Sequence, residues 1–214
     1  MIYPDFCAGC NQQLLMSEKG VCSSCWIELK PFQFNNNKPA FFGRQMVYRE
    51  LYAFEFIKNE MLQKILHNIK YRGNKEAAFV LGIELGKILL KYQNQIDVII
   101  PVPVSDKKKI KRGFNQSECI ANGVQNILDK PVLNDYLFRK NNMSSQVKSK
   151  RFQRWQNVEY QYITKGDLSI DFKNILLVDD VITSGATIHS CLSAFPTKTI
   201  KFTVAALAAK KMLL

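Results

Sequence analysis

One stretch of the sequence decides the fold of this chain: Asn174-Ile175-Leu176-Leu177-Val178-Asp179-Asp180-Val181-Ile182-Thr183-Ser184-Gly185-Ala186-Thr187. Its first residues, 174–178, form the apolar run typical of a strand buried on both faces of a parallel sheet. The run leads directly into two adjacent carboxylates, at the carboxyl edge where α/β proteins bind ligands. The small and hydroxyl-bearing residues that follow predict a loop entering a helix, and the free N–H groups there favour a phosphate.

This order of acids and loop indicates a class of ligand. Asp179 and Asp180 can accept hydrogen bonds from sugar hydroxyls, and the loop after them can hold a phosphate. Gly185 allows the backbone to approach the anion. We therefore expect a phosphorylated sugar as ligand; the alternative is an acidic turn before a capped helix. Thr183, Ser184 and Thr187 add hydroxyl donors to the loop.

Strand-like and helix-like segments alternate along the rest of the chain. The predicted strands are residues 51–56, 96–100, 131–133, 174–178 and 201–208. The predicted helices are residues 58–69, 76–91, about 115–128, and a last one that includes 189–192. Gly82 and Gly86 share one face of the second helix and allow close packing there. This alternation predicts an α/β fold with a parallel sheet flanked by helices.

Four of the six cysteines lie near the start of the chain, in two C-x-x-C pairs: Cys7, Cys10, Cys22 and Cys25. Two such pairs facing each other complete a tetrahedral site that suits a structural Zn²⁺. Two disulfides are the first alternative, disfavoured without a secretory signal, and a redox C-x-x-C is the second, but such a motif would occur once. The Pro- and Asn-rich residues 31–39 read as a linker, which divides the chain into 1–38 and 39–214.

The charge of the chain points to anionic partners. Lys and Arg number 30 against 18 Asp and Glu, a net charge of +12. The first five residues lack the basic and apolar segments of a secretory signal, so we expect a cytoplasmic protein. The apolar stretch 79–90 is interrupted by two charges and is too short to span a bilayer.

More than half of this excess lies between residues 101 and 160, where twelve Lys and Arg stand against five acids. Phe114, Phe152, Trp155 and Tyr160 are interleaved with these charges, a mixture that could track single-stranded DNA and stack its bases. The same charges could instead hold pyrophosphate, or form a solvated basic face. Each aromatic residue taken alone is more typical of a core.

The segment 178–187 resembles the signature of type I phosphoribosyltransferases for phosphoribosyl pyrophosphate (PRPP). The resemblance implies that Asp179 and Asp180 bind the 2′- and 3′-hydroxyls of the ribose. It implies likewise that the 5′-phosphate is bound by the residues Ile182, Thr183, Ser184, Gly185, Ala186 and Thr187. Mg²⁺ accompanies PRPP in such a site.

Further motifs resemble the ComF family of competence-associated proteins, and the resemblance covers nearly the whole chain. They are Lys70-Tyr71-Arg72-Gly73-Asn74, Ile100-Pro101-Val102-Pro103-Val104, Lys111-Arg112-Gly113-Phe114-Asn115-Gln116-Ser117, the set Arg139, Gln146, Arg151 and Asn157, and the double C-x-x-C. One departure is the run Lys107-Lys108-Lys109, where relatives are expected to carry an arginine. Lys109 then takes its place, which keeps the charge but loses the bidentate fork.

The resemblance implies a phosphoribosyltransferase core with the four-cysteine module as an appendage. Residues 103–112 would be the pyrophosphate loop, with Lys109 and Arg112 as ligand-binding residues, and residues 139–160 would be a flexible loop over the site. Mg²⁺ and basic side chains would stabilise the departing pyrophosphate of a transferase.

Two functions follow from these expectations. In the first, a competence protein acts in DNA uptake with single-stranded DNA and other proteins of the competence machinery, and keeps a PRPP-binding domain. In the second, the chain is a Mg²⁺-dependent phosphoribosyltransferase that acts on an unidentified small acceptor. The two are compatible, and we favour the first. The sequence shows no recognisable pocket for a nucleobase.

Overall fold

The structure, a computed structural model, describes residues 5–33, 47–58, 60–140, 161–165, 172–195 and 199–210. Its centre is a four-stranded sheet in the order β1-β6-β5-β2, in which every pairing is parallel. These strands are β1 (Val47–Glu55), β2 (Val98–Pro101), β5 (Asn174–Ile182) and β6 (Lys201–Ala209). A second, antiparallel sheet pairs β3 (Leu137–Arg139) with β4 (Tyr162–Thr164).

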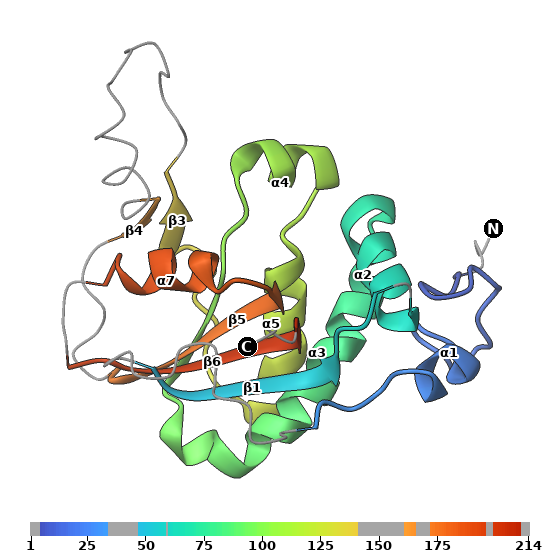
Figure 1. Cartoon of the computed structure of the whole chain (residues 1–214), viewed down its shortest axis with the longest axis horizontal. Helices are drawn as coiled ribbons and strands as arrows, with labels where there is room; N and C mark the ends of the chain where they lie inside the picture. Colours follow the sequence, from blue (N-terminus) through green and yellow to red (C-terminus); the bar gives the residue numbers. More distant parts are fainter. Residues whose placement is uncertain are drawn as a thin grey trace.

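Helices cover both faces of the parallel sheet (Figure 1). One face packs against the three longest helices, which are α2 (Met61–Arg72), α3 (Lys75–Leu89) and α5 (Gln116–Leu128). The other face packs against α7 (Ala186–Leu192) and the small β3–β4 sheet. The shorter elements are α1 (Ser23–Ile27), α4 (Asp106–Arg112) and the 3₁₀ helix η1 (Leu90–Gln95). The predicted α/β fold with a parallel sheet flanked by helices is confirmed.

The sheet is buried on both faces because its strands are apolar at successive positions. Leu176 and Val178 face the α2–α3–α5 layer, while Ile175 and Leu177 face α7, and all four are at most 1% exposed. Burying a side chain of this size stabilises the fold by about 1.5–3 kcal/mol. Beneath the sheet, a Cβ on Gly82 would lie 2.2 Å from the carbonyl oxygen of Ile120, so α3 and α5 pack almost backbone to backbone. Close packing on this face of α3 is as predicted.

The predicted segments differ from the observed elements mainly at their ends. The central strand extends to Ile182, so Asp179 and Asp180 lie inside β5 rather than after it, because β5 pairs along its whole length with the nine residues of β6. Residues 131–133 form no strand, and Val132 makes one isolated bridge to Ile99. The predicted pyrophosphate loop contains helix α4, which begins after Ser105 and ends at Gly113.

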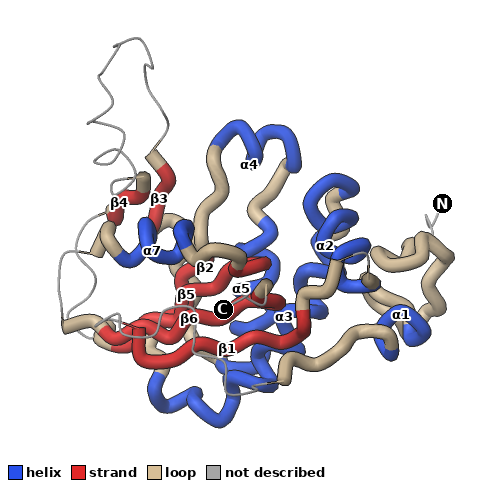
Figure 2. The backbone as a smooth tube through the Cα atoms, viewed as in Figure 1, coloured by secondary structure: helices blue, strands red, loops and turns tan. Residues whose placement is uncertain are grey.

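The four-cysteine module packs directly against the α/β core. Cys7, Cys22 and Cys25 belong to the same buried cluster as the residues of α2 and α3. Figure 2 shows that the chain runs from the module to the edge of the sheet formed by β1. There Pro31 forms an antiparallel bridge with Phe54 of β1. Most of the predicted linker lies outside the described residues. Within the described part of the chain, no helix has both the length and the apolar character needed to cross a bilayer.

Candidate functional site

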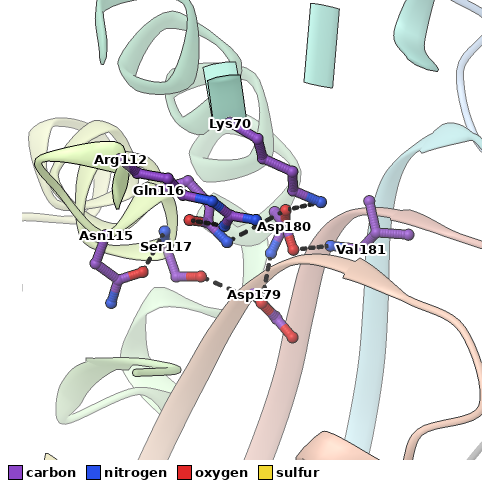
Figure 3. A network of polar contacts seen from close by, with 8 residues as sticks. All are labelled: Lys70, Arg112, Asn115, Gln116, Ser117, Asp179, Asp180 and Val181. Carbon is purple, nitrogen blue, oxygen red and sulfur yellow. Dashed lines mark hydrogen bonds and ion pairs between the residues drawn. The ribbon is translucent and has the colours of Figure 1, made fainter. Parts of the chain in front are cut away.

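The two acids of the central strand lie at the carboxyl edge of the sheet, beside α2 and α5 (Figure 3). Asp180 is 6% exposed, and its Oδ2 pairs with Lys70 Nζ at the end of α2. Gln116 Nε2 donates to the same oxygen at 3.5 Å, and Oδ1 accepts the Val181 N–H at 2.8 Å. The charge of Asp180 is thus matched by one cation from α2, by a neutral donor from α5 and by a backbone N–H of its own strand.

Asp179 is 8% exposed and has a different set of neighbours. Its Oδ1 accepts the Ser117 hydroxyl at 3.2 Å and the Asp180 N–H at 2.8 Å. Burial, followed by the charge of Asp180, raises the pKa of Asp179 to about 8, although these hydrogen bonds and Lys70 act to lower it. At neutral pH the unliganded carboxyl therefore holds its proton for most of the time.

A chain of polar contacts links α4 to Asp180. Arg112 Nη1 donates to Gln116 Oε1 at 2.9 Å, and Gln116 in turn donates to Asp180. Asn115 fixes the start of α5, since its Oδ1 accepts the Ser117 N–H at 3.1 Å while its Nδ2 donates to the Val102 carbonyl at 3.1 Å. Three side chains of the segment 112–117 therefore surround the acids: Gln116 and Ser117 contact them directly, and Arg112 contacts Gln116 (Figure 3).

The loop after β5 has the character that the sequence predicts. Gly185 is buried with φ +72°, a left-handed conformation that glycine adopts without strain. Around it, Thr183, Ser184, Ala186 and Thr187 are exposed, and Ser184 Oγ accepts the Ala186 N–H at 3.5 Å. Ile182 is buried at 3% exposure and anchors the loop in the core. The loop and the two acids occupy the same edge of the sheet.

Of the two basic residues predicted for the pyrophosphate, Arg112 lies closer to the acids in the network. Lys109 instead forms an exposed ion pair with Glu118 at 3.3 Å. The guanidinium of Arg112 also lies 5.5 Å from the ring centre of Tyr71, in a cation–π arrangement. Arg139 lies at the end of β3, whereas Gln146, Arg151 and Asn157 of the predicted flexible loop fall outside the described residues.

Our prediction of individual site residues missed Lys70, Gln116 and Ser117. All three lie in motifs that the sequence analysis singled out, but nothing in those motifs shows which residue meets an acid. Lys70 and Asp180 are 110 positions apart, and only the packing of α2 beside β5 brings them together. A basic residue in the last turn of an amphipathic helix, followed by Gly73, was the available signal.

The four N-terminal cysteines gather beside α2. Their Sγ atoms all lie within 4.8 Å of one another, and Cys10 and Cys22 are 3.8 Å apart. The S···S distance in an ideal tetrahedral Zn–S₄ site is about 3.8 Å, from a Zn–S bond of about 2.3 Å. All four thiols are free, which argues against the disulfide alternative. The cluster can therefore hold a structural metal.

The surroundings of the cluster favour a bound cation. Burial acts to raise the pKa of Cys7, but backbone N–H groups of Cys22, Cys10 and Gly9 outweigh it and lower this pKa to about 7. Burial and the neighbouring thiols raise the pKa of Cys25. A cation would stabilise all four thiolates together. A Cβ on Gly9 would lie 2.7 Å from Cys25 Sγ, so the turn requires glycine for space.

Comparison with curated proteins finds two competence proteins. The chain is 32% identical over 142 residues to competence protein ComFC of Bacillus subtilis, in a match that covers 66% of this chain and 54% of that protein. It is 22% identical over 205 residues to competence protein F of Haemophilus influenzae, covering 86% and 87%. The chain thus spans about half the length of the first relative and most of the second. No family model matches the sequence.

Comparison with solved structures finds phosphoribosyltransferases and related enzymes. Glutamine PRPP amidotransferase from B. subtilis matches with a TM-score of 0.42 and 16% identity, covering 66% of this chain and 30% of that one. Orotate phosphoribosyltransferase from Aeropyrum pernix matches with a TM-score of 0.37 and 15% identity, covering 72% and 78%. Scores of this size carry no argument about function, and the fold is established by the sheet itself. The chain is thus similar in sequence to both competence proteins, in agreement with the resemblance found in its motifs.

Proposed function

We propose that this chain binds a phosphorylated ribose, PRPP with Mg²⁺, at the carboxyl edge of its parallel sheet. One observation carries the proposal: two buried acids near the end of β5 lie a few residues before an exposed, hydroxyl-rich loop around Gly185. Such an arrangement offers acceptors for the 2′- and 3′-hydroxyls and donors for the 5′-phosphate. When bound with the ligand, Mg²⁺ supplies positive charge that stabilises the pyrophosphate.

The residues around the acids have distinct tasks in this proposal. Asp179 and Asp180 accept hydrogen bonds from the ribose, and residues 182–187 enclose the 5′-phosphate. Of the two basic residues predicted to meet pyrophosphate, Arg112 is the better placed, because it already reaches Gln116 beside Asp180. Lys109 becomes available to it only by leaving Glu118. Binding also favours the charged form of Asp179, because a carboxylate accepts more strongly than a carboxylic acid.

Calorimetry with PRPP and Mg²⁺ tests the proposal. Asp180→Asn removes charge and acceptor strength, and it should lower the affinity about tenfold or more, since charge-assisted hydrogen bonds contribute about 1.5–3 kcal/mol each. The double variant Asp179→Asn with Asp180→Asn should bind almost no PRPP while remaining folded. Asp135→Asn, an exposed acid, is the matched control. Wild-type affinity in the double variant would contradict the proposal.

A second candidate function is transfer of the ribosyl phosphate to an unidentified small acceptor. The observation that favours it is the complete set of acids and loop, together with Arg112 beside them. A screen for pyrophosphate release from PRPP across candidate acceptors distinguishes transfer from binding alone. Release that requires both an acceptor and Asp180 would establish the transferase, and its absence with every acceptor would leave the binding function.

We further propose that the chain acts in DNA uptake and contacts single-stranded DNA through α4. This helix is exposed along most of its length and carries Lys107, Lys108, Lys109, Lys111 and Arg112. Phe114, by contrast, is 6% exposed and belongs to the core, so it offers no base a stacking surface. The similarity to two competence proteins supports this role. Other competence proteins are the expected partners.

Reversing two charges on α4 tests the contact with DNA. Lys108→Glu with Lys109→Glu should weaken binding of a single-stranded oligonucleotide and flatten the dependence of log K on log salt. The matched control is Lys87→Glu with Lys91→Glu. It reverses the same number of charges, but on α3 and η1, which lie away from α4. Equal loss in both double variants would show a general effect of charge, and no loss in either would place the DNA elsewhere.

For the N-terminal module we propose one structural Zn²⁺ on Cys7, Cys10, Cys22 and Cys25. Four sulfur ligands in a closed cluster match the preference of Zn²⁺ and keep no open position for catalysis. Reduced thiols are compatible with the cytoplasm. We retain 1–38 and 39–214 as the proposed division of the chain.

A further inference from the structure

The segment Lys70–Asn74 lies between the two candidate sites and contacts both of them. Lys70, at the end of α2, reaches Asp180 at the carboxyl edge of the sheet (Figure 3). Arg72, two residues later, reaches Asn11 beside the four-cysteine cluster. Gly73 ends the helix with φ +73°, and Asn74 caps α3 through the Ala77 N–H at 2.9 Å. The segment therefore forms a short, capped connection between α2 and α3.

Three side chains at this end of α2 and just before α3 form hydrogen bonds with the segment that carries the first cysteine pair. Two of them donate to its backbone carbonyls and one donates to a side chain. Asn68 Nδ2 donates to the Ala8 carbonyl at 2.5 Å, and Asn74 Nδ2 donates to the Phe6 carbonyl at 3.3 Å. Arg72 Nη1 donates to Asn11 Oδ1 at 2.9 Å. The acceptors lie before, inside and just after the turn from Cys7 to Cys10. We call this turn the first knuckle.

The pairing of Lys70 with Asp180 depends on where α2 ends. The ammonium of Lys70 is only partly buried, with 24% of its side chain exposed, whereas the side chain of Asp180 is 8% exposed. Lys70 could therefore turn toward water at little cost if α2 shifted, and Asp180 could not follow it. Removing the cation from a buried carboxylate is strongly destabilising for the charged form.

We propose that Lys70 is a positioning residue for Asp180, and that the first knuckle holds it there through Asn68, Arg72 and Asn74. The knuckle thereby sets the charge environment of both acids, and its loss weakens the ligand site at the sheet edge although no cysteine touches that site. The effect on ligand affinity rests on the proposed PRPP-binding function. The effect on the acids themselves does not.

The first test measures ligand affinity in variants that keep every cysteine. Lys70→Met should lower PRPP affinity about tenfold, and Lys70→Arg should restore most of it, because the charge rather than the shape matters. Asn68→Ala with Arg72→Gln, which loosens the knuckle only, should lower affinity severalfold. Lys64→Met, on an exposed position of the same helix, should leave it unchanged. Lys70→Met and Lys70→Arg binding equally weakly would overturn the positioning role.

The second test needs no ligand and separates this inference from the proposed function. The groups around Asp179 are Asp180 on its own strand, Lys70 from α2, Ser117 from α5, Tyr162 from β4 and Cys191 from α7. Lys70 is the cation among them that lowers the pKa of Asp179, so any variant that releases Lys70 should raise this pKa. Carboxyl-carbon NMR titration of Asp179 measures it.

We expect this pKa to rise in Lys70→Met and, by a smaller amount, in the Asn68→Ala Arg72→Gln variant. An unchanged pKa in that double variant, with circular dichroism showing an intact fold, would overturn the inference whether or not PRPP binds. If wild-type protein binds no PRPP while the pKa moves as expected, the proposed function fails and the link between the knuckle and the acids stands.

Discussion

The four-cysteine module and the carboxyl edge of the sheet both gather polar groups in buried surroundings, but they are assembled in opposite ways. The module draws its four ligands from residues 7–25, within a single short stretch. The edge draws its groups from α2, α5 and β5, so that Lys70, Ser117 and Asp180 meet only in the folded chain. A local site is visible as a spacing in the sequence, whereas a nonlocal site is visible only in fragments.

The two regions also differ in how their charge is balanced. Four thiolates at the module need a cation, and a bound metal would turn their mutual repulsion into folding free energy. At the sheet edge one cation, Lys70, serves two acids, and burial, followed by the charge of Asp180, raises the pKa of Asp179 to about 8. The module is built to stabilise the fold, while the edge keeps buried acids whose oxygens can accept hydrogen bonds from a ligand.

The largest effect is expected from loss of the module's metal. Purified protein should contain about one Zn²⁺ per chain, and Cys22→Ser should lose it, because a site with three thiolates binds much more weakly. The melting temperature should fall by many degrees, since the buried cysteines belong to the core of α2 and α3, while the parallel sheet persists. Cys119→Ser, which changes a half-buried cysteine of α5, is the control. Metal-free wild-type protein, purified reduced and without chelator, would refute the metal site.

A smaller effect is expected at the sheet edge, and it depends on pH. The pKa of Asp179 is about 8 in the folded chain and about 4 when unfolded, so between these values the folded state holds the additional proton. The free energy of unfolding should therefore fall as the pH rises from about 4 to about 8, and should level off above that. Asp179→Asn should lessen this fall and stabilise the unliganded protein near pH 8 by at least about 1.4 kcal/mol, which corresponds to a single pKa unit of the difference between about 4 and about 8.

Chemical denaturation at a series of pH values measures this difference. Exposed Asp135→Asn is the control and should leave the profile unchanged. If Asp179→Asn destabilises the chain across the whole range, the acid has a structural role and the contrast between the two regions disappears.

The smallest effect is expected from an ion pair at the point where the chain passes from the cysteine module to the sheet. Lys30 pairs with Glu60, just before α2, at 2.9 Å, but the two side chains are 57% and 38% exposed. Exposed pairs contribute about 0.2–1 kcal/mol, so Lys30→Ala should lower the free energy of unfolding by no more than that. A larger loss would mean that this contact, rather than the core around the cysteines, holds the module in place.

Much of the architecture could be predicted from the sequence because its signals are local. The apolar run 174–178 identified the central strand, and the paired cysteines identified a cluster that can hold a metal. The ends of elements were less predictable, since pairing with β6 extends the strand through Asp179 and Asp180. Helix α4 was predicted as a loop because its run of lysines has no apolar periodicity. None of the residues of this helix is buried.

The candidate site was predicted in part, for the same physical reason. Its acids and phosphate loop are consecutive in sequence and have a recognisable chemistry. The roles of Lys70 and Gln116 depend on which helices cover the sheet and how far each one extends, and no short motif encodes these distances. The double role of the segment 70–74 could be recognised only once the module and the sheet edge were seen on either side of it.

A crystal structure of the protein with PRPP and Mg²⁺ tests the central claim most directly. The account predicts the ribose hydroxyls against Asp179 and Asp180, the 5′-phosphate within residues 182–187, and Lys70 still beside the acids. Well-ordered PRPP bound anywhere else, such as the hollow of about 420 Å³ that Asn68 and Arg72 line beside the cysteine module, with the sheet edge unchanged, would contradict it.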